Sequence, residues 1–462
     1  MLNRKFVGRV EELNYLEELY NSSKFEFCIL YGRRRIGKTL LVSKFCEGKK
    51  SVFHMGKVGS EKRELEALSQ VISNSLLEGS AVNFETFEAA LNFMAKYGEG
   101  ERLVFVIDEF PYFANSVVGA MSALQHAIDH HLSKTQLMII LTGSSVSFME
   151  QEVLGNKSPL FGRKTGVLHL KPMPLNESAI LSNRGAVESV VVQAMTGGVP
   201  QYIEYFGDKE IPLMEAIENN WFNKGGLLYQ EPSFLLSMET RNSGNYLQVL
   251  EVLASGKNTL NKIATKLNLP TPNISATLNT LVDLGIVKKE YPFKQKQGRR
   301  GIWKIVDPLF AFHMEFVSPY LSVLEQGKIE GPLGVLKEGL NKYVGRQFEQ
   351  MCHTYFLRNT KLAITAINRW WGPNPETNTN EEIYLVAEDN RGKMVFGECK
   401  WTKEKIGLPV FKELERKSKL LTSSPDKEYY LFSRSGFTKE LAEANVATLV
   451  SVEMMVEPVA SL

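Results

Sequence analysis

A glycine-rich stretch near the start of the chain has residue types and spacing suited to binding phosphate. In "YGRRRIGKTLL", four residues separate Gly32 from Gly37, Lys38 and Thr39, between a strand-like apolar run and a helical pattern. Glycines let backbone N–H groups wrap a phosphate, the lysine reaches the β- and γ-phosphates, and the hydroxyl binds Mg²⁺. A glycine-rich turn without a ligand is the alternative, but a phosphate site requires this strand–loop–helix context. We therefore expect ATP and Mg²⁺ as cofactors, held by Gly32, Arg33, Arg34, Arg35, Ile36, Gly37, Lys38, Thr39 and Leu40.

Two acidic residues follow a uniformly apolar run and complete the expected site. "RLVFVIDEF" puts Asp108 and Glu109 at the carboxyl end of a predicted strand, where α/β sheets bind ligands. We expect Asp108 to hold Mg²⁺ through water and Glu109 to polarise the attacking water, although a surface acidic pair is the alternative. A third run ends in "LTGSS", where Ser144 is the first candidate and Thr142 the second for sensing the γ-phosphate. Such hydroxyl residues also cap helices. Together with Lys38, these residues predict an enzyme that hydrolyses ATP.

A second set of residues whose types and spacing are suited to catalysis lies near the carboxyl end of the chain. Glu398 and Lys400 in "GECKW" stand two residues apart on a predicted strand, and Glu349 lies on a predicted helix before it. The two acids could hold Mg²⁺, with Lys400 steering the water that the metal activates. The preceding strand, "EEIYLV", offers Tyr384 where a second carboxylate should stand. Glu382, roughly 7 Å away on the same face, is near enough to compensate only in part.

The order of apolar and amphipathic segments predicts several domains. Up to about residue 170, short strand-like runs alternate with amphipathic segments, which predicts an α/β fold with a parallel sheet and crossover helices. Helical patterns follow near 175–183, 187–196 and 211–221. The stretch "EQGKIEGPLG" predicts a linker, and beyond it a helix, three strands, a helix and a strand form a separate α/β unit. The expected domains are 1–170, 171–240, 241–320 and 336–462.

The segment from Asn245 to Trp303 has the pattern of a winged helix-turn-helix. "PTPNISATLNTL" is the expected recognition helix, and the wing, residues 286–304, carries seven Lys or Arg and one Glu. That difference gives a local charge of +6 on a chain of net charge +2, so a nucleic-acid surface is expected here. The alternative is a lid or docking surface with a solvated wing. For double-stranded DNA we expect contacts from Asn273, Ser275, Thr277, Lys294, Lys296, Arg299 and Arg300.

The composition excludes some classes of protein. The 462 residues are 44% hydrophobic and 23% charged, as in soluble globular proteins. The N-terminal segment lacks an apolar signal core, and no apolar run is long enough to span a bilayer. We therefore expect a cytoplasmic protein with no membrane partner. The four cysteines lack metal-ligand spacing, so we expect free thiols, three of them buried.

Five short motifs occur in a characteristic order along the first part of the chain. They are "FVGR", "YGRRRIGKT", "VIDEF", "LTGSS" and "LFGR". In this order and spacing they resemble archaeal-type ATPases, which are grouped near the STAND and origin-recognition branches of the AAA+ proteins. The resemblance implies an AAA+ core with a helical lid, ATP hydrolysis and assembly into a homo-oligomer. It also places Val7 and Arg9 near the adenine, Pro200 of the lid motif "GGVP" near the nucleotide, and Arg163 as an arginine finger or nucleotide sensor.

The carboxyl end of the chain resembles the restriction-endonuclease-like domain, of PD-(D/E)XK type, found at the C-terminal end of proteins of this ATPase family. The resemblance rests on the element order and on Glu349, Glu398 and Lys400. Family members usually have "EID" where this chain has "EIY", so Tyr384 occupies the metal-bridging position. We therefore favour a nuclease-like domain that is catalytically weak or inactive and serves for binding. An active Mg²⁺-dependent nuclease and a STAND-like switch that acts through protein contacts are the alternatives.

Overall fold

The computed structural model describes residues 6–240, 242–295, 301–375, 377–422, 424 and 426–457. The chain forms two compact units, residues 1–172 and 173–462. The expected lid, winged helix and C-terminal domain all lie within the second unit. Within the described residues, no helix is long and apolar enough to cross a membrane. All four cysteines are free and three are buried, as predicted.

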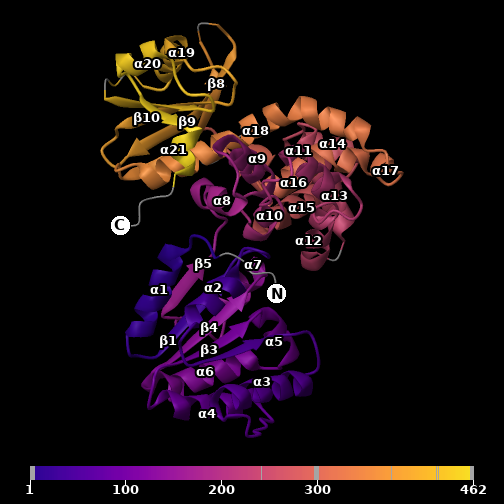
Figure 1. The fold of residues 1–462 in the computed structure, drawn as a ribbon, viewed down its shortest axis with the longest axis vertical. Helices are drawn as coiled ribbons and strands as arrows, with labels where there is room; N and C mark the ends of the chain where they lie inside the picture. Colours follow the sequence, from indigo (N-terminus) through magenta and orange to yellow (C-terminus); the bar gives the residue numbers. More distant parts are fainter. Residues whose placement is uncertain are drawn as a thin grey trace. The chain divides into compact units, whose positions relative to one another are not determined.

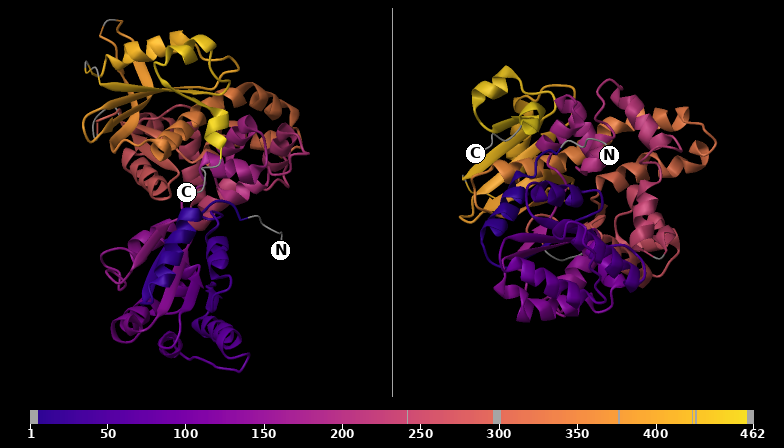
Figure 2. Two further views of the ribbon diagram at one scale, coloured as in Figure 1. Left: turned by 60° about the vertical axis from the view of Figure 1, so that its left-hand side comes forward. Right: turned by 60° about the horizontal axis from the view of Figure 1, so that its bottom comes forward.

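The first unit is built on a parallel five-stranded sheet with helices on both faces (Figure 1 and Figure 2). The strands lie in the order β2-β3-β4-β1-β5, and β1, β3 and β4 are buried along their whole length. Such burial explains their continuous apolar sequences. The strands are β1 (Glu26–Tyr31), β2 (Ser51–Met55), β3 (Leu103–Asp108), β4 (Leu137–Gly143) and β5 (Gly166–His169). The predicted parallel sheet is confirmed, although the short edge strand β5 was not predicted.

The helices of the first unit connect these strands. They are α1 (Val10–Asn21), α2 (Lys38–Cys46), α3 (Glu61–Leu76), α4 (Phe87–Gly98), α5 (Phe110–Ser116), α6 (Ala120–His130) and α7 (Val146–Phe148). Two of them matter for function because of where they begin. Helix α2 starts at the end of the glycine-rich loop after β1, and α5 starts directly after the acidic pair that ends β3.

The second unit begins with helices and a winged helix-turn-helix. The three predicted helices are present, as α8 (Leu175–Ser182), α9 (Ala186–Thr196) and α11 (Leu213–Ile217), whereas α10 (Pro200–Glu204) and α12 (Glu231–Glu239) were not predicted. The winged helix comprises α13 (Ser243–Ala254), α14 (Leu260–Leu267), α15 (Thr271–Asp283), β6 (Val287–Glu290) and β7 (Ile302–Ile305). Strands β6 and β7 pair antiparallel to form the wing. Ile263, Ile274, Leu278 and Leu281 lie in one buried core.

A long helix joins the winged helix to the C-terminal sheet. After α16 (Pro308–Phe316) and α17 (Leu321–Leu324), helix α18 (Glu330–Asn359) runs for 30 residues. The predicted linker is therefore wrong from Glu330 onward. Leu333 and Leu336 are buried, and tertiary burial of an apolar face outweighs the roughly 1 kcal/mol per residue that glycine costs a helix.

The C-terminal part is a mixed five-stranded sheet in the order β12-β11-β10-β9-β8 (Figure 1). Its elements are β8 (Ile364–Pro373), β9 (Asn380–Asp389), β10 (Met394–Lys400), α19 (Leu408–Ser418), β11 (Lys427–Ser433), α20 (Lys439–Ala444), β12 (Thr448–Ser451) and α21 (Val452–Val456). Helix α18, three antiparallel strands, α19 and the parallel strand β11 follow in the predicted order. The elements α20, β12 and α21 were not predicted.

Candidate functional site

The glycine-rich loop connects the end of β1 to the start of α2. A Cβ on Gly32 would lie 2.4 Å from the Leu170 carbonyl oxygen, so only glycine fits beside the chain after β5. Gly37 caps α2 with a φ of 94°, a left-handed conformation that other residues rarely adopt. The two glycines are therefore required by the shape of the loop, and they leave the N-terminus of α2 facing it.

Lys38 and Thr39 join the loop to the acidic pair and to the end of β4. The Lys38 ammonium donates to the carbonyls of Gly32 (2.9 Å) and Arg33 (3.2 Å) and to the Ser144 hydroxyl (2.7 Å). The Thr39 hydroxyl donates to Asp108 Oδ2 at 2.7 Å. Residues from three separate segments thus converge at the carboxyl end of the sheet, as the sequence predicts for a phosphate site.

Asp108 is a buried carboxylate whose partners are neutral. It is 0% exposed, and the hydroxyls of Thr39 and Thr142 donate to its two oxygens. A hydroxyl and a carboxylate side by side at the start of α2 are the hard oxygen ligands that Mg²⁺ prefers. The residues therefore fit ATP with Mg²⁺, with Thr39 and Asp108 as the groups that would hold the metal.

Glu109 adopts a backbone conformation that is uncommon for a residue with a side chain. Its φ is 52°, in the left-handed region, at the N-cap of α5, and such positions often mark functional sites. The Ser144 hydroxyl donates to Glu109 Oε1, and the Ser144 N–H donates to Oε2 at 3.3 Å. Three of the residues predicted for catalysis therefore form one chain of hydrogen bonds, from Lys38 through Ser144 to Glu109.

Other predicted nucleotide-site residues support the loop. The Arg9 guanidinium donates to the Ile36 carbonyl (3.3 Å) and pairs with Glu12 (2.9 Å), so it holds the loop backbone. Arg34 donates to the Tyr112 hydroxyl of α5 at 2.5 Å. The sequence reasoning missed Tyr112, which follows the acidic pair by three residues. Of the other predicted residues, Val7 and Ile36 are buried, and Arg33, Arg35 and Leu40 are half-buried.

Two predicted residues occupy other places. Arg163 pairs with Asp129 of α6 through two contacts of 2.8 and 2.7 Å and donates to the carbonyls of Pro159 and Phe161. It therefore anchors its own loop in this structure. Pro200 is the first residue of α10, within the second unit.

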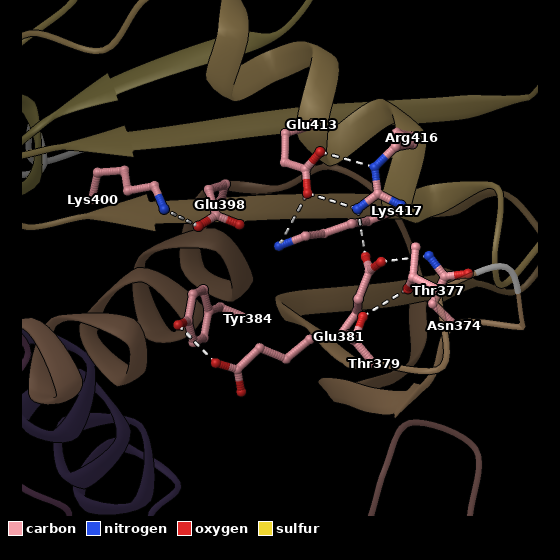
Figure 3. A network of polar contacts seen from close by, with 11 residues as sticks. Asn374, Thr377, Thr379, Glu381, Tyr384, Glu398, Lys400, Glu413, Arg416 and Lys417 are labelled. Carbon is pink, nitrogen blue, oxygen red and sulfur yellow. Dashed lines mark hydrogen bonds and ion pairs between the residues drawn. The ribbon is translucent and has the colours of Figure 1, made fainter.

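The carboxyl-end residues form a different kind of site, shown in Figure 3. Glu398 pairs with Lys400 at 2.8 Å, and the Tyr384 hydroxyl donates to Glu382 at 3.0 Å. Burial raises the pKa of Glu349 on α18 to about 7, and the negative charges of Glu382 and Glu398 add to the effect while Lys304 and Arg369 oppose it. Among the described residues, no group of three His, Cys, Asp or Glu side chains could hold a metal ion. The metal-binding role expected for Glu349 and Glu398 therefore stays a prediction.

A second network in Figure 3 lies beside this set. Glu381 of β9 accepts from Arg416 of α19 at 2.6 Å and from the Asn374 amide at 2.6 Å. Arg416 also pairs with Glu413 on its own helix. Neighbouring residues of one strand point to opposite faces, so Glu381 fastens α19 while Glu382 meets Tyr384. The sequence reasoning did not identify this contact.

The predicted DNA-contacting residues are only partly placed. Asn273 is exposed on α15, Ser275 is half-buried, and the Thr277 hydroxyl donates back to the Asn273 carbonyl at 3.0 Å. Lys294 of the wing pairs with Glu388 of β9 at 2.7 Å. Lys296, Arg299 and Arg300 lie outside the described residues. Of the four wing residues predicted to contact DNA, the one with a described position, Lys294, is therefore already engaged by the C-terminal sheet.

Comparisons with known families match three regions of the chain. Residues 6–206 match an ATPase domain predominantly from Archaea, and residues 245–290 match the IclR helix-turn-helix domain. Residues 313–416 match a family of archaeal and bacterial proteins of unknown function. The first region spans the described part of the phosphate-loop unit and continues through α8 to α10, and the second spans α13 to β6 of the winged helix. None of these three family descriptions names a nuclease.

Individual relatives agree with these matches. The chain is 29% identical over 435 residues to an uncharacterized protein of Methanocaldococcus jannaschii, covering 92% of this chain and 94% of that protein. An uncharacterized ATP-binding protein of the same organism is 58% identical over 45 residues, which cover 10% of this chain and 76% of that protein. The fold is similar to that of a Walker-type ATPase of Pyrococcus abyssi, with a TM-score of 0.52 and 20% identity over 68% of this chain and 99% of that one. Residues 6–206 are therefore similar to the ATPase domain found predominantly in Archaea, and residues 245–290 are similar to a helix-turn-helix domain.

Proposed function

We propose that the protein hydrolyses ATP at the carboxyl end of the first sheet and that nucleotide turnover controls engagement of double-stranded DNA by the winged helix. One observation carries the enzymatic part: the hydrogen-bonded chain from Lys38 through Ser144 to Glu109. ATP with Mg²⁺ supplies the phosphoanhydride that is cleaved. The chain of side chains brings a cation and a carboxylate base to the same end of the sheet.

Each residue of that chain has a distinct role in the proposal. Lys38 neutralises phosphate charge, because its ammonium already lies among the carbonyls of the loop. Glu109 accepts the proton of the attacking water, a role that requires a carboxylate within hydrogen-bond reach. Ser144 orients Glu109 through its hydroxyl and its N–H, and so acts as a positioning residue. Thr39 and Asp108 would hold the metal.

The test compares phosphate release by the full chain and by Glu109→Gln. We expect turnover to fall by roughly 100-fold or more, the size of a lost general base, while ATP binding measured by titration calorimetry is retained. Glu47→Gln is the matched control, because Glu47 pairs only with exposed Lys44 in the same unit. Equal rates in the wild type and Glu109→Gln would exclude Glu109 as the base, and a wild type without turnover would exclude hydrolysis.

The DNA part of the proposal rests on the helix-turn-helix match and on the exposed polar face of α15. Asn279, like Asn273, is exposed on α15. We expect Asn273→Ala/Asn279→Ala to weaken binding of duplex DNA, measured by fluorescence anisotropy, by roughly 10-fold or more, since one good amide–adenine contact is worth about 1–3 kcal/mol. Asn359→Ala at the end of α18 is the control. Unchanged affinity in the double variant, or no DNA binding by the wild type, would count against this part.

A second candidate function is a nucleotide-controlled switch that acts through protein contacts. It is favoured by one observation, the pairing of the wing residue Lys294 with Glu388. A wing whose lysine contacts the C-terminal sheet is suited to binding protein surfaces. An ATP-dependent change in oligomeric state without DNA affinity would support this function over the first.

A further inference from the structure

The wing of the winged helix is packed into the C-terminal sheet. Phe293, which follows β6, is only 6% exposed and belongs to the same hydrophobic core as Ile383 and Val386 of β9. Its N–H donates to the Arg369 carbonyl at 3.0 Å, and the Asn368 amide donates to the Tyr291 carbonyl at 2.9 Å. Arg369 and Asn368 lie on β8, the edge strand of the sheet. The wing therefore covers an edge that would otherwise present unpaired backbone groups.

Charged contacts connect the wing to the residues of β9 at which a nuclease would bind its metal. Buried Glu290, at the end of β6, lies 3.0 Å from the Arg369 guanidinium and 3.3 Å from Lys288. Arg369 also lies 3.9 Å from Glu382, which accepts the hydrogen bond from Tyr384. A continuous path of polar contacts thus leads from the wing to the tyrosine that stands in place of a metal ligand.

Each carboxylate along this path already has a partner. Glu290 has Arg369, Glu382 has Tyr384, and Glu398 has Lys400. Lys304 of β7 lies within electrostatic range of both Glu290 and Glu349. Cations on the wing, β8 and β10 therefore lie beside the acidic residues, and leaving buried Glu290 or Glu398 unpaired would be costly.

We propose that Glu349 and Glu382, together with Tyr384, form an acidic face that is a docking site for the wing, with Arg369 of β8 and the wing residue Lys304 supplying the positive charge that a metal supplies in a nuclease. The C-terminal domain then serves to fix the winged helix. This inference is independent of ATP hydrolysis, because it concerns contacts within the second unit alone.

Hydrogen–deuterium exchange of the full chain tests the docking. We expect the Phe293 amide to be protected in the wild type and to exchange at least roughly 10-fold faster in Glu290→Gln and in Phe293→Ala. Lys266→Gln, on the exposed face of α14, is the matched control and should leave the rate unchanged. An unprotected Phe293 amide in the wild type, or unchanged exchange in both variants, would overturn the docking.

Metal binding tests the other half of the proposal. The full chain without nucleotide is titrated with Mn²⁺ and followed by electron paramagnetic resonance, with Asp108→Asn identifying any ion bound at the glycine-rich loop. We expect Glu398→Gln and Glu349→Gln to leave the number of bound ions unchanged. One Mn²⁺ present in the wild type and lost in Glu398→Gln would show a metal site and overturn the proposal, even if the wing remains protected from exchange.

Discussion

The phosphate-loop site and the acidic face of the C-terminal domain contain similar residue types but hold them differently. Asp108 accepts from two hydroxyls, and the Lys38 ammonium donates to carbonyls and a hydroxyl. In the C-terminal domain, Glu398 pairs with Lys400, and Arg369 pairs with Glu290 of the wing. A carboxylate held by neutral donors keeps its charge available for a cation, whereas one paired with lysine or arginine is already compensated. The partners, rather than the acidic residues themselves, distinguish a site prepared for a ligand from a structural one.

The strongest way to break this comparison is to remove the lysine of each site. We expect Lys38→Ala to weaken ATP binding by roughly 100-fold or more, about 3 kcal/mol, because it deletes a charge-assisted contact to phosphate. Lys400→Ala should change ATP affinity by less than about twofold. Both are measured by titration calorimetry. The comparison fails if the two variants bind ATP equally well.

The acidic face can be tested through its unusual ionisation. The pKa of Glu349 is raised to about 7 by burial, from an ordinary value of 4.5. The carboxyl is thus protonated in the folded protein and ionised in the unfolded chain between these pH values, so stability falls as pH rises from 4.5 to about 7. The raised pKa therefore lowers the free energy of unfolding by about 3 kcal/mol at pH 8. We expect Glu349→Gln to remove this penalty and to be more stable than the wild type at pH 8, with little difference near pH 4.5.

Tryptophan fluorescence can isolate this effect in urea unfolding experiments. All five tryptophans, at positions 221, 303, 370, 371 and 401, lie in the second unit, so the signal reports that unit alone. Glu453→Gln, an exposed position on α21, is the control and should show the wild-type pH dependence. A wild type whose urea midpoint is the same at pH 5 and pH 8 would contradict the prediction.

The smallest effect is expected at the exposed pair of Arg163 and Asp129. Pairs in water contribute little to stability, so Asp129→Asn should shift the melting temperature by less than about 2 °C and leave ATP turnover unchanged. Comparing Arg163→Ala with Asp129→Asn shows whether Arg163 only holds its own loop or also acts on nucleotide bound by a neighbouring subunit. If turnover falls roughly 10-fold or more in Arg163→Ala alone, the arginine acts in catalysis. Equal behaviour of the two variants would assign it to the loop.

The phosphate-loop site could be predicted largely because its signals are local. Uniform apolar strands end directly in the functional residues, and the loop glycines stand at fixed spacing. Lys38, Asp108, Glu109 and Ser144 meet because parallel strands end at one edge of a sheet. Strand β5 was missed because four residues at a sheet edge carry little periodicity.

The docking of the wing could not be predicted, because its contacts join distant parts of the chain. Asn368 meets Tyr291 across 77 positions, and Lys294 meets Glu388 across 94. The same basic wing sequence is consistent with DNA contact and with docking, and only the tertiary structure shows which partner Lys294 has. The order of helices and strands in the C-terminal domain was predictable, whereas the partners of Glu398 and Glu382 were not.

Helix α18 limits how the C-terminal domain can be exchanged or removed. The Tyr343 hydroxyl in its first half donates to the carbonyls of Ala194 (2.8 Å) and Pro308 (2.9 Å), so this half is part of the helical core before the sheet. The second half supplies Phe348 and Phe356, which are buried in the second unit. A deletion placed at the start of α18 would remove core residues of the preceding region together with the sheet. Recombination that gives this protein a different C-terminal domain must therefore preserve the first half of the helix, and the matched family region agrees, since it begins at residue 313 within α16.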